Sequence, residues 1–401
     1  MRLRMAPLFA VLGPGLLAGL SDDDPAGITT YSVLGAGHGY DLLWVLLLST
    51  VALIVFHDLG ARMGVVTGQG LIGLIRHRYG VGVAAGALLA LVVANLGTAT
   101  AELAGVAAGS ELLGLSRYVA VPLAAVVVTW LVLAGSFHRV EHVLMALAAV
   151  FVAYVGAGVL AHPDWAGALH GLVTPRMSFG RDETVIVAAT VGTTLAPWGL
   201  SFIQSYAVDK KLTTKDLAFE RLDVVLGAVL TGVIGFFVVV ACAATLHARG
   251  LTIQTASDAA QALAPLAGDL AGTLFAVGLI GAALLAAAVL PLSTAYSICD
   301  FVGSPSAVDL TFSEARLFYL SNIAVTAAAA TVVLLPGVPL VPLLVSTQTL
   351  NSILLIPLLV LMARMGRDRT VLGSFIVSRR LALAHVLTVA AVVVCVALLL
   401  L

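Results

Sequence analysis

Charged residues are scarce in this chain. Lys, Arg, Asp and Glu make up 10% of its 401 residues, whereas a soluble domain carries about 25%. Hydrophobic residues make up 61%, and the mean hydropathy is +1.10. These values exclude an ordinary soluble domain and indicate an integral membrane protein, with the lipid bilayer as its main surroundings.

Other features are also missing. The net charge is −1 and no basic block occurs, so nucleic acid is not expected as a partner. The three cysteines have no paired spacing, which argues against a disulfide framework or a zinc site. No phosphate-binding loop, nucleophile elbow or zinc-enzyme motif is present. We therefore expect no enzymatic activity, no cofactor and no obligate protein partner.

Long apolar runs are abundant. Runs near 20 residues are typical of membrane-spanning helices, and the alternating strands of about 10 residues that build barrels are not seen. The sequence predicts an all-α protein with eleven spans, and their ranges are 8–36, 40–57, 82–113, 118–135, 141–161, 184–206, 222–247, 270–299, 314–335, 339–363 and 381–401.

The basic residues indicate an orientation for these spans. With a cytoplasmic N-terminus, the inner segments hold 16 Lys and Arg and the outer segments hold 4, which accounts for all 20. Cytoplasmic loops carry an excess of Lys and Arg. The sequence therefore predicts a multi-pass protein of the cytoplasmic membrane, with the N-terminus inside and the C-terminus outside.

The first span contains S-D-D-D-P-A-G at residues 21–27. If these acids formed a loop, the preceding span would have roughly 16 residues, short of the ~20 that a crossing needs. Alternatively, 8–36 is one crossing that is broken at Asp24-Pro25, because proline cannot continue the helical hydrogen bonds. Carboxyl groups at that depth indicate a functional site. We favour the broken span.

A second break supports this interpretation. Residues 190–205 read T-V-G-T-T-L-A-P-W-G-L-S-F-I-Q-S, with a proline again inside an apolar run. Two broken spans five spans apart are typical of an inverted repeat with its binding site between the breaks. We expect a single membrane domain with a first repeat in 1–161, a second in 184–363 and an additional helix at 381–401.

At these residues the chain resembles the Nramp family of divalent-metal transporters, which share the LeuT-type 5+5 inverted repeat with broken helices 1 and 6. The family's Asp-Pro-Gly-Asn motif is matched by Asp24-Pro25-Ala26-Gly27, and its helix 6 Met-Pro-His by Ala196-Pro197-Trp198. The resemblance implies a metal site at Asp24, Gly27 and Ala196, to which Ser21 and Thr193 contribute backbone carbonyls. It also implies a metal role for Gln348 on helix 10, with Asn351 as the second choice; otherwise either amide links helices.

The departures from the family pattern carry information on the cargo. Gly27 stands where the family has asparagine and Ala196 where it has methionine, so only Asp24 remains of the three usual side-chain ligands. A thioether is a soft ligand, whereas hard oxygen ligands suit Mg²⁺, Ca²⁺ or Mn²⁺. The pattern is most similar to the Nramp-related magnesium transporters. We therefore expect uptake of partly hydrated Mg²⁺, with Mn²⁺ as a further cargo.

Proton coupling is expected to be weak or absent. Trp198 replaces the family's titratable histidine, and Gly105 stands where a second acid often occurs. Glu102 matches the helix 3 aspartate and serves either as a proton relay or as a hydrogen-bond partner. Asp22 and Asp23 have no family counterpart and are expected to line the pathway.

Two other functions remain open. One is a typical proton-coupled Mn²⁺/Fe²⁺ symporter, and the other is a Na⁺-coupled amino-acid or small-solute symporter, against which the three acids argue. Elsewhere we expect ordinary interfacial charge at His57-Asp58, an inside loop without a special role at Asp300 and Asp309, and an exposed polar side chain in an outside loop at His170.

Overall fold

The protein is helical, without strands, throughout the part that the structure describes. The structure is a computed structural model and describes residues 18–19, 21–133, 153–308 and 310–399. The helices of eight residues or more are α3 (Pro25–His38), α4 (Leu43–Thr67), α5 (Leu71–Tyr79), α6 (Val81–Leu112), α7 (Arg117–Leu133), α9 (Ala153–Leu160), α10 (Trp165–Val173), α11 (Arg181–Thr194), α12 (Pro197–Asp209), α13 (Leu217–Thr245), α16 (Ala271–Val302), α17 (Arg316–Val333), α18 (Leu340–Met365) and α20 (Arg379–Leu399). Three shorter helices are α14 (Ala256–Ala260), α15 (Ala264–Ala267) and α19 (Arg369–Leu372).

Eight helical stretches within the described residues are long and apolar enough to cross a membrane, and α7 is a shorter apolar helix. These nine correspond to nine of the eleven predicted spans. The other two predicted spans, 8–36 and 141–161, lie partly outside the described residues. The count of eleven therefore stays a prediction.

One predicted boundary is wrong. The second span was expected to end at residue 57, with His57 and Asp58 at the interface, but α4 continues to Thr67. Asp58 pairs with Arg62 one turn later, at 2.9 Å, so these charges are accommodated inside the helix. The helix ends at Gly68, whose φ of 63° is a left-handed conformation that favours glycine.

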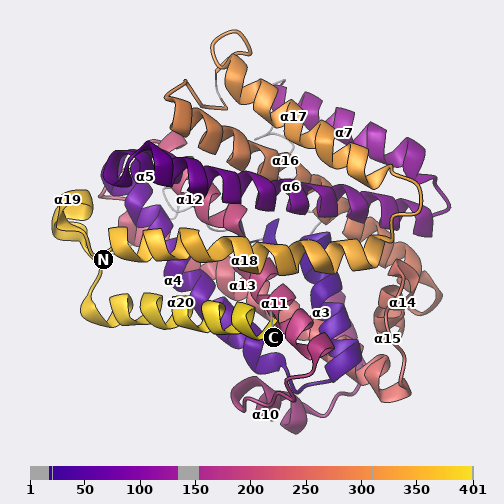
Figure 1. The fold of residues 1–401 in the computed structure, drawn as a ribbon. Coiled ribbons are helices and arrows are strands. Elements are labelled where there is room, and N and C mark those ends of the chain that lie inside the picture. The colour runs from indigo at the N-terminus through magenta and orange to yellow at the C-terminus, as the bar shows by residue number, and fades with distance from the viewer. Residues whose placement is uncertain (1–17, 20, 134–152, 309, 400–401) are drawn as a thin grey trace, which may run out of the picture.

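The two interrupted helices lie in the interior of the bundle. In the apolar 18-residue stretch that includes the break between α11 and α12, 94% is buried inside the protein. In the corresponding stretch of α20, 28% is buried. In Figure 1, α7 and α17 run together along the upper edge, α20 lies at the lower left, and α11 and α3 lie to the right of α20, below α18. The repeats and the additional helix at 381–401 stay predictions.

Helices α11 and α18 approach each other closely at Gly192. A Cβ on Gly192 would lie 1.9 Å from the carbonyl oxygen of Gln348 and 2.7 Å from the amide nitrogen of Ser352. Both atoms belong to the backbone of α18, which cannot yield as a flexible side chain does. Small residues allow this kind of backbone contact between membrane helices.

We expect Gly192→Ala to destabilise the protein by roughly 1–3 kcal/mol or more, as overpacking does. Thermal unfolding of the purified protein in detergent would measure the effect. Gly86→Ala on α6 is the matched control, because no atom lies within 4 Å of its Cβ position. Equal unfolding temperatures for the two variants would contradict the close contact.

Candidate metal site

The first break precedes α3. Asp24 has an extended backbone (φ −76°, ψ 169°) and caps the helix, since its Oδ1 accepts a hydrogen bond from Gly27 N at 2.5 Å. Pro25 occupies the first helical position, where no N–H is needed. The sequence D-P-A-G thus starts a new helix inside the bundle and leaves residues 23–24 non-helical.

The second break lies between α11 and α12. Helix α11 ends at Thr194, Leu195 and Ala196 leave the helical path, and α12 begins at Pro197. A hydrogen bond of 2.9 Å between Tyr31 of α3 and Thr194 holds the two interrupted helices together. Both breaks that the sequence predicts are therefore present, and they adjoin each other.

Three oxygens surround Gly27. A Cβ on Gly27 would lie 2.7 Å from the carbonyl oxygen of Asp22, 3.2 Å from Asp24 Oδ1 and 3.3 Å from Thr193 Oγ1. Because glycine has no Cβ, the backbone can come this close to a carbonyl, a carboxylate and a hydroxyl oxygen. Such oxygen donors suit hard divalent cations.

The donors differ in part from those expected. Thr193 presents its side-chain hydroxyl, and this atom has no hydrogen-bond partner within the described ranges. The carbonyl nearest Gly27 is that of Asp22; the Ser21 carbonyl is not among its three nearest atoms. Sequence reasoning missed both atoms, because it could not orient the unwound segment against α11.

Four carboxyl groups gather near the first break. Asp22, Asp23 and Asp24 are 2%, 2% and 3% exposed, and Glu102 of α6 is fully buried beside Asp24. Asp22 Oδ2 and both carboxylate oxygens of Asp23 lack a hydrogen-bond partner among the described residues. Buried carboxylates without partners are unfavourable unless a cation or a proton compensates them. The arrangement is therefore suited to a cationic ligand.

Helix α12 contributes no ligating side chain at its start. Ala196 and Trp198 are 3% and 1% exposed. The Trp198 carbonyl accepts a hydrogen bond from Ser293 of α16 at 2.9 Å, which fixes the first turn of α12. The indole N–H has no partner in the described part of the chain. It can donate but not bind a metal ion.

The two amides of α18 form a separate network. Asn351 Nδ2 lies 2.8 Å from both Gln348 Oε1 and Thr98 Oγ1 of α6. Gln348 Nε2 has no hydrogen-bond partner within the described ranges. Gln348 also meets α11 at Gly192, next to Thr193. The structure thus brings both amides near the second break, without placing either at the oxygens around Gly27.

His57 of α4 was not expected near this site. It is 2% exposed, and its Nε2 lies 3.2 Å from the position that a Cβ on Gly199 would occupy. Asp22 Oδ1 lies 3.9 Å from the same point. The expected interfacial place of His57 is therefore wrong. Asp58 and Arg62 are four residues apart, the spacing at which opposite charges pair on a helix. This spacing was the sequence signal that α4 continues past His57.

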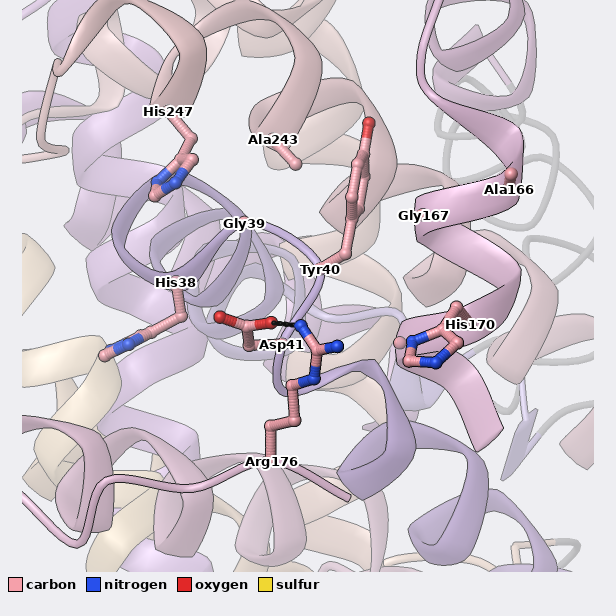
Figure 2. Close-up of a pocket in the computed structure, with 11 residues that line it drawn as sticks. His38, Gly39, Tyr40, Asp41, Ala166, Gly167, His170, Arg176, Ala243 and His247 are labelled. Atoms are coloured by element: carbon pink, nitrogen blue, oxygen red, sulfur yellow. Dashed lines mark ion pairs between the residues drawn. The ribbon is translucent and has the colours of Figure 1, made fainter. Parts of the chain in front are cut away.

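A cavity of about 540 Å³ lies where α3, α10 and α13 meet. Figure 2 shows His38, His170 and His247 around it, with an ion pair of 3.5 Å between Asp41 and Arg176. Nowhere in the described ranges are three His, Cys, Asp or Glu side chains arranged as a metal cage. This finding covers both the cavity and the Gly27 region, where a backbone carbonyl and a hydroxyl lie beside the Asp24 carboxylate.

Comparison with known families decides the relationship. The family model "Natural resistance-associated macrophage protein-like", or Nramp, matches residues 15–401. The chain belongs to the Nramp family. This Nramp chain is 29% identical over 384 residues to the "Divalent metal cation transporter MntH" of Burkholderia ambifaria, covering 91% of this chain and 84% of the relative. It is 27% identical over 305 residues to MntH of Bacillus subtilis, covering 71% and 69%.

Solved structures support the fold. The Eremococcus coleocola manganese transporter has a TM-score of 0.79 at 18% identity, with 98% of this chain and 87% of that chain covered. MHP1, a nucleobase-cation-symport-1 family transporter, has a TM-score of 0.58 at 14% identity, with 92% and 81% covered. The predicted family and LeuT-type fold class are confirmed. The Nramp chain is a divalent metal cation transporter of the membrane and not an enzyme, and the metal is its cargo, not a cofactor.

We expect Gly27→Ala to weaken divalent-cation binding, probed with Mn²⁺, at least tenfold, or by about 1.4 kcal/mol. The added methyl group would enter the space between the three oxygens. Isothermal titration calorimetry on the purified protein measures the affinity. Gly37→Ala on the same helix is the control, because no atom lies within 4 Å of its Cβ position. If Gly27→Ala binds the ion as tightly as the wild type does, the binding site does not lie beside Gly27.

Proposed function

We propose that this Nramp chain imports Mn²⁺ across the cytoplasmic membrane by alternating access, with the ion bound between the two breaks. The observation that carries the proposal is the set of oxygens from Asp22, Asp24 and Thr193 around Gly27. Half-helices that meet at mid-membrane are the usual place for the cation in transporters of this architecture. The cited relatives named for manganese support this ion as the cargo.

The proposal revises the expectation of magnesium. The names of the cited relatives refer to divalent metal or manganese, and the typical manganese symporter fits them better than the magnesium branch does. Mn²⁺ also accepts carboxylate, carbonyl and water ligands, so the absence of a thioether at Ala196 does not exclude it.

Mg²⁺ is the second candidate cargo, because of one specific feature of the site. Position 196 carries a methyl group and position 27 carries no side chain, so neither sulfur nor an amide reaches the ion from these positions. Mg²⁺ keeps several waters and is held through one or two carboxylates. The oxygens around Gly27 would suit such a hydrated ion.

We also propose that Mn²⁺ entry is linked to protons, contrary to the expectation of weak coupling. That expectation rested on Trp198, which cannot titrate. Asp22, Asp23, Asp24 and Glu102 are all buried, and four negative charges so close together in an apolar surrounding are strongly unfavourable. Protons that bind some of these carboxyl groups together with the cation, and accompany it, would balance this charge.

We expect Asp24→Asn to abolish Mn²⁺ uptake into liposomes, because the carboxylate charge at the first break is lost. The protein should remain folded, since asparagine also caps helices. Asp182→Asn, at the exposed start of α11, serves as the control and should keep wild-type uptake.

The same assay discriminates between the cargoes. Excess Mn²⁺ should inhibit uptake of labelled Mn²⁺ far more strongly than equal Mg²⁺ or Ca²⁺. Strong inhibition by Mg²⁺, together with direct Mg²⁺ uptake, would replace manganese with magnesium as the proposed cargo. Persistent uptake by the Asp24→Asn variant would place the site elsewhere.

Glu102→Gln tests the proton linkage. A pH-sensitive dye inside the liposomes should report acidification during Mn²⁺ uptake by the wild type, because protons accompany the ion. We expect the variant to lose most of this signal while it retains Mn²⁺ uptake. Uptake by the wild type without acidification would contradict the linkage and restore the earlier expectation.

A further inference from the structure

A smaller cavity of about 220 Å³ lies at the C-terminal ends of α12 and α16. Asp209, the last residue of α12, and Asp300, near the end of α16, both line it, together with Ser205 and Gly70. Asp300 was expected in a loop without a special role. That expectation is wrong, because α16 extends to Val302 and directs this carboxyl group into the protein.

Two oxygens converge on Gly70. A Cβ on Gly70 would lie 1.7 Å from Asp300 Oδ2 and 2.8 Å from Ser205 Oγ. Neither oxygen is solvent-accessible, and neither has a hydrogen-bond partner within the described ranges. Ser205 as a whole is 5% exposed. Buried polar atoms without a protein partner are uncommon, and an ion or a water molecule can satisfy them.

The second carboxylate is held in place. Asp209 Oδ2 accepts hydrogen bonds from Tyr296 Oη at 2.6 Å and from the Val308 amide at 3.4 Å. Both aspartates also lie at helix C-termini, where the helix dipole disfavours negative charge and favours a cation. Two carboxylates at such positions thus require positive charge nearby.

Helix α12 connects this cavity with the proposed Mn²⁺ site. Its first residue, Pro197, follows the break at Ala196, and its last residue is Asp209. Thirteen residues of helix span about 20 Å at 1.5 Å per residue. An ion that leaves the break along α12 would therefore meet the cavity at the other end of the helix.

We propose that this cavity is a second binding site, which holds a divalent cation in transit between Asp209, Asp300 and Ser205. The inference rests on the proposed function only for the identity of the ion. The two carboxylates supply the charge, and the Ser205 hydroxyl supplies a neutral oxygen, a donor set that suits Mn²⁺ or Mg²⁺.

Lys211 is the competing source of positive charge, because it lines the same cavity. If its ammonium group already compensates the carboxylates, no ion is needed there. The proposed site instead predicts that Lys211 weakens cation binding by repulsion. The role of Lys211 is therefore part of the test.

The number of Mn²⁺ ions bound per full-length chain tests the proposal, with free Mn²⁺ followed by electron paramagnetic resonance. We expect two ions in the wild type, one in Asp24→Asn, one in Asp300→Asn and none in the double variant. Asp216→Asn, in the loop after α12 and outside the cavity, is the control and should bind two.

Two further variants keep the test independent of folding defects. Ser205→Ala should weaken the second ion severalfold, and Lys211→Gln should tighten it severalfold. Loss of all binding in Asp24→Asn would overturn the second site and leave the proposed function intact. Retention of one ion in Asp24→Asn and its loss in the double variant support the site, even if the transport assays reject Mn²⁺ as cargo. A second ion that appears only in Lys211→Gln would show that Lys211 occupies the cavity, and would overturn the proposal.

Discussion

The structure depends on one constraint: inside a membrane, backbone N–H and C=O groups and charged side chains without partners are unfavourable in free energy. A helix can be interrupted at that depth only where the freed groups find partners in the protein or line a polar space. Asp24 meets this constraint directly, because its carboxylate caps α3 and simultaneously faces the space at Gly27. The group that makes the break tolerable is thus also the group that can attract a cation. In the proposed function, the Asp24 side chain would therefore both cap α3 and bind the cation.

The surrounding helices hold the two breaks in register. Tyr31 bonds Thr194 across them, and Ser293 bonds the Trp198 carbonyl. On the far side, the backbone of α18 touches Gly192. Each of these contacts joins segments that are far apart in the chain. Since α3 and α12 begin at the breaks, movement of either half-helix would change the distances between the groups at the breaks.

Cargo and coupling depend on what replaces the family's usual side chains. The absence of sulfur and amide ligands at positions 196 and 27 favours hard oxygen coordination, which both Mn²⁺ and Mg²⁺ accept. In the proposed function the carboxyl groups would carry the protons, because Trp198 cannot titrate. Asp209 and Asp300 lie at the opposite end of α12 from the break. In the two proposals together, carboxylates would therefore bind the ion at both ends of this helix.

Sequence alone determined the membrane class, nearly all the spans and both breaks, because hydropathy and proline act locally. The motifs also selected Asp24, Gly27 and Thr193 as site candidates, and the structure places these three residues close together. Only the tertiary structure decided which atoms of these residues meet: the hydroxyl of Thr193 and the carbonyl of Asp22, which depend on how an unwound segment is oriented against another helix. The places of His57 and Asp300 were mistaken for the same reason. A charged residue near the end of an apolar run looks interfacial, and only its packing partners on other helices reveal that it is buried.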